Sequence, residues 1–264
     1  MLEMPLQVVI LAAGQGKRMH SNLPKVLHPI AGKALAQHVI DTARSLAPEK
    51  LVVVYGHGGE VVRSTLESAD ILWAKQEPQL GTGHAVAQAL PELSATGKTL
   101  VLYGDVPFVR TSTMQAMLNR LHEADSPAAV VLGFAPADPL QYGRVIAKDG
   151  VIAKMVEHKD ASEAERACRL CNSGLMAVKA KDLFGLLARV GNDNAQGEYY
   201  LTDIVNIANE DGRICAVVVT DDEHEVAGIN SRGELAQAEA RWQERRRAVA
   251  MADGATLVAP ETVW

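Results

Sequence analysis

The chain has 264 residues, a formal net charge of −6 at pH 7 and 48% hydrophobic residues, which is ordinary for a soluble protein of one large or two small domains. No apolar run reaches the ~18 residues that a transmembrane helix requires, and the apolar N-terminus begins with an acidic rather than a basic residue, unlike a signal peptide. Aromatic residues make up only 4% and do not alternate with basic ones, which argues against nucleic-acid binding. We therefore expect a cytoplasmic protein whose ligands are neither membrane nor nucleic acid.

The three cysteines, Cys168, Cys171 and Cys215, are an odd number in a long chain, which is typical of reduced thiols. Cys168 and Cys171 form a C-x-x-C pair, but a structural zinc site would need a second pair of ligands. A redox motif would open a helix, whereas Cys171 leads into a strand-like run. We expect ordinary thiols.

Apolar runs of strand length recur along the chain, at residues 7–13, 51–56, 99–105, 128–135, 172–178 and 214–219. Several are apolar at consecutive positions, as in strands that are buried on both faces of a parallel sheet. Helical patterns separate many of them, at 33–46, 83–93 and 113–121. The alternation predicts an α/β fold, Rossmann-like, with a mostly parallel sheet that binds its ligand at the carboxyl ends of the strands.

Two later segments break this alternation. Residues 143–159 read as a hairpin that turns at 148–150, which predicts a β-rich insertion. Residues 231–251 form a long polar helical pattern, and Ser231 with Glu234 fits a capping box at its start. The predicted organisation is a domain over 1–230, a linking helix over 231–251 and a further segment over 252–264.

The loop after the first apolar run contains Gly14 and Gly16 and gathers cations that include Arg18 and Lys25, while no acidic residue lies between Met4 and Ile40. The spacing fits neither a Rossmann fingerprint nor a Walker A loop. Two glycines nevertheless let backbone N–H groups approach an anion, and arginine and lysine add formal charge. We interpret the loop as an anion site rather than a solvated turn.

Three residues of the stretch 76–85 could recognise a base. The Gln76 amide can both donate to and accept from a uracil edge, Gly81 permits close approach, and Thr82 could cap the following helix. A plain glycine turn is an equally good interpretation from these residues alone. His84 in the same stretch, and His57 further upstream, are predicted to be structural.

Asp105 follows a buried strand, and its carboxylate there is a hard oxygen ligand suited to Mg²⁺. Asn230 could supply a second oxygen to the same ion. A turn aspartate and a helix-start asparagine are the alternatives.

Short motifs in a fixed order carry a resemblance to a known family. The stretch "LAAGQGKRM" followed by "LPKVL" resembles the signature of the sugar-nucleotide pyrophosphorylases. Further along follow "QLGTGHA", "YGDVP", "YGRV", "VEHKDA", "NSG", "GEYYLTD" and "VAGINSR". Together they resemble the uridyltransferase part of the bacterial bifunctional N-acetylglucosamine-1-phosphate uridyltransferases/glucosamine-1-phosphate acetyltransferases. The resemblance implies that UTP and N-acetylglucosamine-1-phosphate are converted to UDP-N-acetylglucosamine and pyrophosphate, with Mg²⁺, for cell-wall precursor synthesis.

The resemblance also implies roles for individual residues. Arg18 and Lys25 would be catalytic, and Asp105 and Asn230 would hold Mg²⁺. The nucleotide would be bound by Leu11, Ala12, Ala13, Gly14, Gln76, Gly81 and Thr82. The sugar side would be formed by Gly143, Glu157, Asn172, Tyr200 and Thr202. Tyr103 would touch either sugar or ribose, and Gly104 and Asn230 would complete the substrate contacts. Taken singly, each of the sugar-side residues is more often structural, and only the resemblance favours a role in binding.

The bifunctional family carries a C-terminal left-handed β-helix that has acetyltransferase activity and forms homotrimers. Residues 252–264 resemble only the first strand of that domain, as the start of a truncated β-helix. We therefore expect no acetyltransferase activity from this chain and a weakened tendency to trimerise. Two alternatives remain open at this point. One is a related pyrophosphorylase with another base or sugar; the other is a non-catalytic sugar-nucleotide sensor, which would not need Arg18, Lys25 and Asp105.

Overall fold

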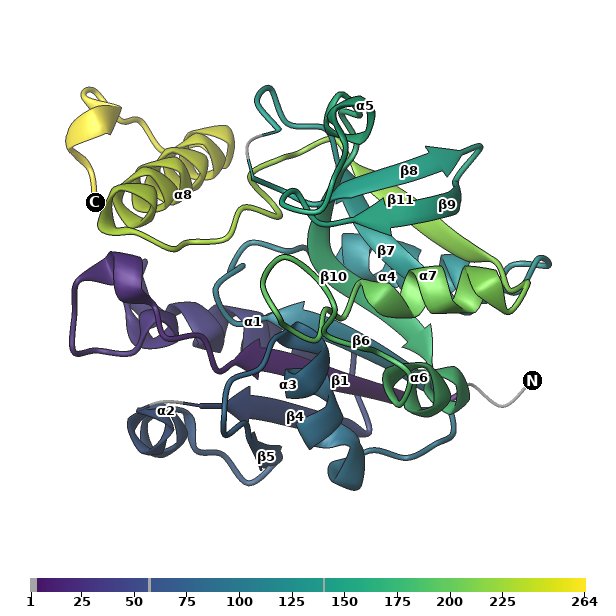
Figure 1. Ribbon diagram of the computed structural model, residues 1–264. Coiled ribbons are helices and arrows are strands. Elements are labelled where there is room, and N and C mark those ends of the chain that lie inside the picture. Colours follow the sequence, from purple (N-terminus) through teal and green to yellow (C-terminus); the bar gives the residue numbers. More distant parts are fainter. Residues whose placement is uncertain (1–3, 57, 140) are drawn as a thin grey trace.

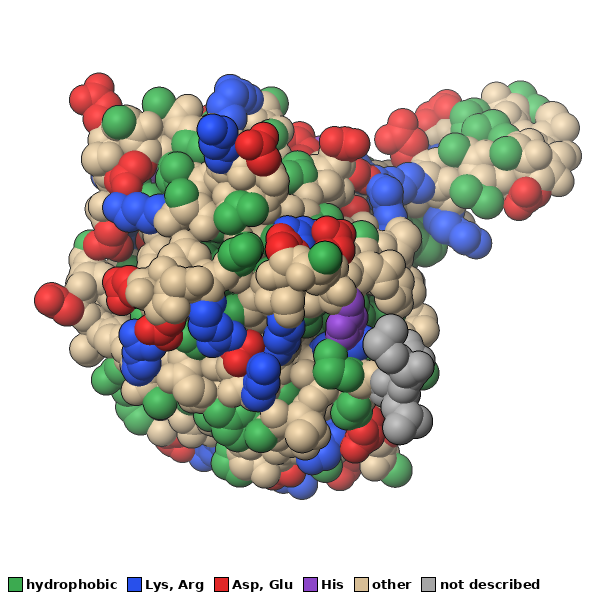
Figure 2. Space-filling model, turned by 90° about the vertical axis from the view of Figure 1, so that its right-hand side faces the viewer, with side chains coloured by type: hydrophobic (Ala, Val, Ile, Leu, Met, Phe, Trp, Pro, Cys, Tyr) green, Lys and Arg blue, Asp and Glu red, His purple; other side chains and the backbone are tan. Residues whose placement is uncertain are grey.

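The computed structural model describes residues 4–56, 58–139 and 141–264, so His57, predicted to be structural, lies outside the described residues. None of the described helices is both long and apolar enough to cross a membrane. On the face drawn in Figure 2, the coloured Lys and Arg side chains are interspersed with Asp and Glu.

A nine-stranded sheet forms the centre of the molecule, in the order β5-β4-β1-β6-β10-β7-β11-β9-β8 (Figure 1). Its strands are β1 (Leu6–Ala12), β4 (Lys50–Tyr55), β5 (Ile71–Lys75), β6 (Lys98–Tyr103), β7 (Ala129–Phe134), β8 (Arg144–Lys148), β9 (Val151–Val156), β10 (Cys171–Lys179) and β11 (Cys215–Thr220). All six predicted runs form strands. Consecutive residues of β1 are fully buried because the sheet is covered on both faces.

The sheet is mixed rather than mostly parallel. Strands β5, β4, β1 and β6 run parallel, but β10 lies antiparallel between β6 and β7. The α/β class predicted from the sequence is confirmed, whereas the direction of β10 was not predicted. Strand β5 was missed because its apolar run is only the four residues before Lys75.

Helices cover both faces of the sheet: α1 (Leu35–Arg44), α2 (Gly59–Leu66), α3 (Thr82–Ala89), α4 (Thr111–Arg120), α5 (Glu163–Arg166), α6 (Ala180–Leu187), α7 (Asp203–Glu210) and α8 (Arg232–Ala252). Side chains of successive β1 residues enter two separate apolar clusters, Val8 and Ile10 on one face, Val9 and Leu11 on the other. Between these two clusters β1 and β6 pair in parallel, which places their carboxyl ends side by side.

The β8–β9 hairpin forms the predicted β-rich insertion. Its turn residues Asp149 and Gly150 both have positive φ angles, 50° and 77°. The side chain of Asn206 on α7 fixes β9 through two 2.9 Å hydrogen bonds to the backbone of Met155. The hairpin is therefore part of the main body of the fold (Figure 1).

Helix α8 begins at Arg232, directly after its N-cap Ser231, and the predicted capping box between Ser231 and Glu234 is present. Residues 253–264 contain no strand and form a single 3-10 turn, η4 (Pro260–Thr262). Their membership of a β-helix stays a prediction.

Short elements also follow β1. They are η1 (Lys17–Met19), η2 (Lys25–Leu27) and the small pair of strands β2 (Pro29–Ile30) and β3 (Lys33–Ala34). A further short element, η3 (Leu90–Glu92), extends α3.

Candidate active site

The carboxyl ends of β1 and β6 border a cavity of about 460 Å³. Many of its lining residues were predicted from the sequence: Leu11, Ala13, Gly14, Lys25, Gln76, Gly81, Thr82, Tyr103 and Asp105. The others are Gln15, Lys17, Val26, Gln79, Ala85 and Glu198. The cavity therefore joins the cation-rich loop after β1 to the stretch predicted to recognise a base.

Three predicted residues meet at one point of this site. The Lys25 ammonium, with only 12% of its side chain exposed, forms an ion pair with the Asp105 carboxylate. The same ammonium donates to the Asn230 Oδ1 oxygen at 2.8 Å. A carboxylate and an amide oxygen from distant parts of the chain thus converge on one positive charge.

The backbone holds these residues in place. The Gly104 N–H donates to the Leu11 carbonyl, and the Ile229 N–H donates to the Asp105 carbonyl, both at 2.9 Å. A Cβ atom at Gly104 would lie 3.3 Å from Leu11 O, so the missing side chain lets β6 and β1 approach closely at their ends. The position of Asp105 is therefore set by main-chain contacts on both sides.

The donor set of Asp105 and Asn230 fits a divalent cation. Both residues supply hard oxygen atoms, and both oxygens already bind one cation, the Lys25 ammonium. Among the described residues, no cluster of three or more His, Cys, Asp or Glu side chains offers a metal site. An ion held by two protein oxygens would complete its shell with water and ligand oxygens.

Gln76 is 4% exposed at the far wall of the cavity. Its amide nitrogen donates to the Gly81 carbonyl at 2.9 Å and lies 3.1 Å from His84 Nδ1. Gln88 contacts the other ring nitrogen at 3.2 Å, so His84 is held on both sides, in agreement with its predicted structural role. These bonds fix Gln76 in one orientation.

Thr82 does not cap α3 as predicted. It is the first residue of the helix rather than the residue before it, and its hydroxyl accepts from the Leu201 N–H at 3.0 Å. Gly83 N–H donates to the Tyr199 carbonyl at 2.7 Å. The contacts attach the start of α3 to the segment that contains Tyr199–Thr202, so the nucleotide side and the predicted sugar side are packed together.

Alanine at Gly81 should destabilise this wall of the cavity. Gly81 has a φ of 111°, and a Cβ there would lie 2.6 Å from the Tyr199 carbonyl oxygen, a backbone atom that cannot rotate away. We expect the free energy of unfolding to fall by about 1–3 kcal/mol and nucleotide affinity to fall with it. Calorimetry and nucleotide titration measure the two effects. Gly185→Ala is the matched control because nothing lies within 4 Å of its added Cβ; equal behaviour of both variants would contradict the prediction.

Four predicted sugar-side residues form a second cluster. Thr202 Oγ1 donates to Glu157 Oε1 at 3.1 Å, and the Asn172 N–H donates to the Gly143 carbonyl at 2.9 Å. A Cβ atom at Gly143 would lie 3.1 Å from Glu157 Oε2, so glycine makes room for that carboxylate. Burial raises the pKa of Glu157. These groups offer one carboxylate, one amide and one hydroxyl for hydrogen bonding.

Tyr103 lies between the two clusters. Its ring packs on Gly174, where a Cβ would lie only 2.8 Å from Tyr103 Cε2. Burial raises the pKa of its hydroxyl, and the charges of Glu157 and Asp105 raise it further. The phenol is therefore neutral at physiological pH and stands beside both carboxylates.

Two predicted residues make no hydrogen bond to either cluster through their side chains. Arg18 is exposed on η1, does not line the cavity, and contacts no described residue through a hydrogen bond or ion pair. Tyr200 is buried and its hydroxyl accepts from Gln196 at 2.8 Å. Two contributors were missed: Gln79, which donates to the Ala13 carbonyl, and Gln15, whose amide donates to Gln79 Oε1 at 2.8 Å. The signal for Gln79 was its place within the base-recognition stretch.

Comparisons with known proteins show the family to which the chain belongs. The family described as MobA-like NTP transferase domains matches residues 8–171, more than half of the chain and the part that contains Lys25 and Asp105. The chain belongs to the MobA-like NTP transferases. This transferase is 71% identical over 265 residues to the bifunctional protein GlmU of Novosphingobium aromaticivorans, an alignment that covers 100% of this chain and 58% of that protein. It is 61% identical over 261 residues to GlmU of Sphingopyxis alaskensis, covering 98% and 57%.

The transferase thus spans a little over half the length of these curated relatives, and the resemblance predicted from its motifs is confirmed. A solved UDP-glucose pyrophosphorylase complexed with UDP-glucose matches its fold with a TM-score of 0.71 at 18% identity, covering 92% of this chain and 100% of that one. The predicted α/β nucleotidyltransferase fold is confirmed by this likeness. The three cysteines are free thiols, as expected.

Proposed function

We propose that this transferase joins UTP and N-acetylglucosamine-1-phosphate, in the presence of Mg²⁺, to give UDP-N-acetylglucosamine and pyrophosphate. The observation that carries the proposal is the convergence of Lys25, Asp105 and Asn230 beside a cavity large enough for a nucleotide. The GlmU relatives support the choice of substrates.

A phosphate oxygen of the sugar phosphate attacks the α-phosphorus of UTP, the bond from that phosphorus to the bridging oxygen breaks, and pyrophosphate leaves. The nucleophile is already an anion, so no general base is needed, in agreement with the bound state of both His84 ring nitrogens. The obstacle is charge: two unit charges at ~4 Å repel by about 4 kcal/mol at an effective dielectric constant near 20. Positive groups must therefore gather where the two phosphates meet.

Lys25 would supply one such group by moving from Asp105 and Asn230 to a phosphate oxygen. Asp105 and Asn230 would then hold Mg²⁺, which supplies Lewis-acid charge neutralisation when bound. Positioning and charge stabilisation account for most of the rate in phosphoryl-type transfer. The ion pair of Lys25 keeps the two oxygen ligands oriented until then.

The two ends of the cavity fit the two substrates. The backbone after β1 and the fixed amide of Gln76 would bind the uridine, with Gly81 giving the base close access. Glu157, Asn172 and Thr202 would bind the sugar hydroxyls and the acetamido group. Tyr103 lies between these two sets of residues, where ribose and sugar would meet.

Pyrophosphate release tests the proposal. Five nucleoside triphosphates (UTP, CTP, ATP, GTP and dTTP) are each mixed with N-acetylglucosamine-1-phosphate or glucose-1-phosphate in the presence of Mg²⁺. We expect release with UTP and the N-acetylated sugar alone. Release with another pair would retain the chemistry and overturn the substrates, and UTP binding without any release would favour a sensor.

Arg18→Ala should slow turnover far more than it weakens UTP binding. Arg18 is exposed at the loop after β1 and has its guanidinium available to a leaving pyrophosphate. We expect kcat to fall about 100-fold or more, as for other charge-stabilising groups, with UTP affinity nearly unchanged. Steady-state kinetics and UTP titration separate the two. Equal losses in both would indicate simple ground-state binding.

A further inference from the structure

The first turn of α8, predicted as a linker, contacts the candidate site directly. One carboxylate oxygen of Glu234 accepts from the Ser231 N–H at 3.0 Å, the usual contact of a capping box. The same oxygen accepts from the Asn230 N–H at 2.6 Å, one residue further back. Glu234 therefore binds the backbone of the residue whose side chain faces Lys25.

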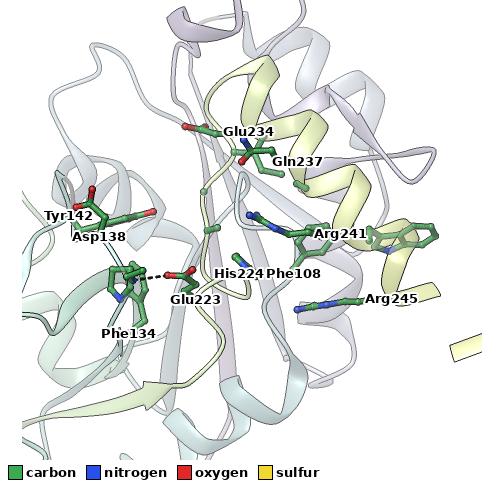
Figure 3. A pocket seen from close by; sticks show the side chains of 17 residues that line it. Phe108, Phe134, Asp138, Tyr142, Glu223, His224, Glu234, Gln237, Arg241 and Arg245 are labelled. Carbon is green, nitrogen blue, oxygen red and sulfur yellow. Dashed lines mark hydrogen bonds between the residues drawn. The ribbon is translucent and has the colours of Figure 1, made fainter. Parts of the chain in front are cut away.

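The backbone just before Asn230 borders open space on one side. Gly228 and Ile229 line a second cavity, of about 380 Å³, whose wall also includes Glu234 (Figure 3). Figure 3 shows Glu234, Gln237, Arg241 and Arg245 along the side of α8 that faces this cavity. Open space borders the segment on one side. On the other side the Ile229 N–H donates to the Asp105 carbonyl, and the Glu234 contact is the bond that holds the Asn230 N–H.

Helix α8 is itself anchored to the loop that follows β1. Arg232 Nε donates to the Met19 carbonyl at 3.0 Å, and Glu239 Oε2 accepts from the Ala31 N–H at 2.6 Å. Ile229 and Ala238 share a small buried apolar cluster with residues of that segment. The helix is thus a fixed support from which Glu234 can orient Asn230.

We propose that Glu234 is a positioning residue for the cation site: it holds the Asn230 backbone so that Oδ1 stays directed at the same point as the Asp105 carboxylate. The proposal rests on the proposed function, since it assigns the metal to these two oxygens. It predicts that Glu234 governs metal affinity without touching the metal.

The test measures Mn²⁺ binding by electron paramagnetic resonance on the full chain saturated with UTP. Glu234→Ala should raise the Mn²⁺ Kd about 10-fold, the usual scale for groups that orient metal ligands. Glu234→Gln should bind nearly as wild type because its amide oxygen still accepts both N–H groups. An unchanged Kd in folded Glu234→Ala would overturn the proposal.

Two controls separate positioning from helix stability. Ser231→Ala removes the other half of the same capping box and leaves the bond from Asn230 to Glu234; it should lower the melting temperature and keep the Mn²⁺ affinity. Glu165→Ala breaks the equivalent capping box at α5, which is far from Asn230 in sequence, and should leave the Mn²⁺ affinity unchanged. A loss of affinity in Ser231→Ala equal to that in Glu234→Ala would show that Glu234 acts only through helix stability. Failure of the wild-type chain to bind Mn²⁺ with UTP would instead contradict the metal site itself.

Discussion

Asp105→Asn should lower pyrophosphate release about 100-fold at limiting Mg²⁺, with partial recovery as Mg²⁺ is increased, since removal of a carboxylate charge weakens a hard-cation site. The substitution keeps the size of the side chain and one oxygen, so the loss reflects charge. It also removes the anionic partner of Lys25, which leaves the ammonium bound to Asn230 alone. Initial rates measured over a Mg²⁺ series give the requirement of each protein.

Asp70→Asn is the matched control for this series. Asp70 is a surface carboxylate that pairs with Arg44 at 2.7 Å, and 51% of its side chain is exposed. Its loss should leave the Mg²⁺ dependence unchanged, because exposed ion pairs contribute little. If Asp105→Asn followed the same Mg²⁺ curve as the wild type, Asp105 would not be a metal ligand.

Lys25→Met should have opposite effects on turnover and on metal binding. Turnover should fall about 100- to 1000-fold, the usual cost of removing one group that stabilises developing negative charge. Metal affinity in the absence of nucleotide should rise, because the ammonium that occupies both the Asp105 and the Asn230 oxygen is gone. Single-turnover kinetics and Mn²⁺ titration without nucleotide measure the two effects.

Lys17→Met is the control for Lys25→Met. It also removes one positive charge from the wall of this cavity, but Lys17 has no described contact with Asp105 or Asn230. Its effect on Mn²⁺ binding gives the part that comes from long-range charge alone. An increase in affinity no larger in Lys25→Met than in Lys17→Met would show that Lys25 does not compete with the metal.

Much of the fold was predictable because the inner strands are buried on both faces and read as unbroken apolar runs. Two features were not. Strand β5 lies at the edge of the sheet, where burial is incomplete and the apolar run is correspondingly weak. The antiparallel direction of β10 depends on its pairing with β6 and β7, contacts that connect distant parts of the chain and leave no periodic signal.

The candidate site divides in the same way. Charge and glycine content predicted a site at the loop with Lys25, and strand position predicted the place of Asp105. For Asn230 and Glu157, the order of the motifs, rather than local chemistry, favoured a role in binding over a structural role. The role of Thr82 was misjudged because its partner, the Leu201 N–H, is 119 residues away in sequence. Side chains whose roles depend on distant backbone atoms cannot be assigned from their neighbours in the chain.

The separation of Lys25 from Asn230, 205 residues, has a consequence for how the protein is made. During synthesis the strands that surround β1 emerge well before α8, and domains fold as their segments become available. A nascent chain could thus form the β5-β4-β1-β6 half of the sheet while still lacking one proposed metal ligand and its Glu234 support. Closing such a long loop is slow compared with local pairing. Complete cation binding would then come only after α8 has joined the sheet, and ligands that need Asn230 would selectively stabilise chains in which α8 is in place.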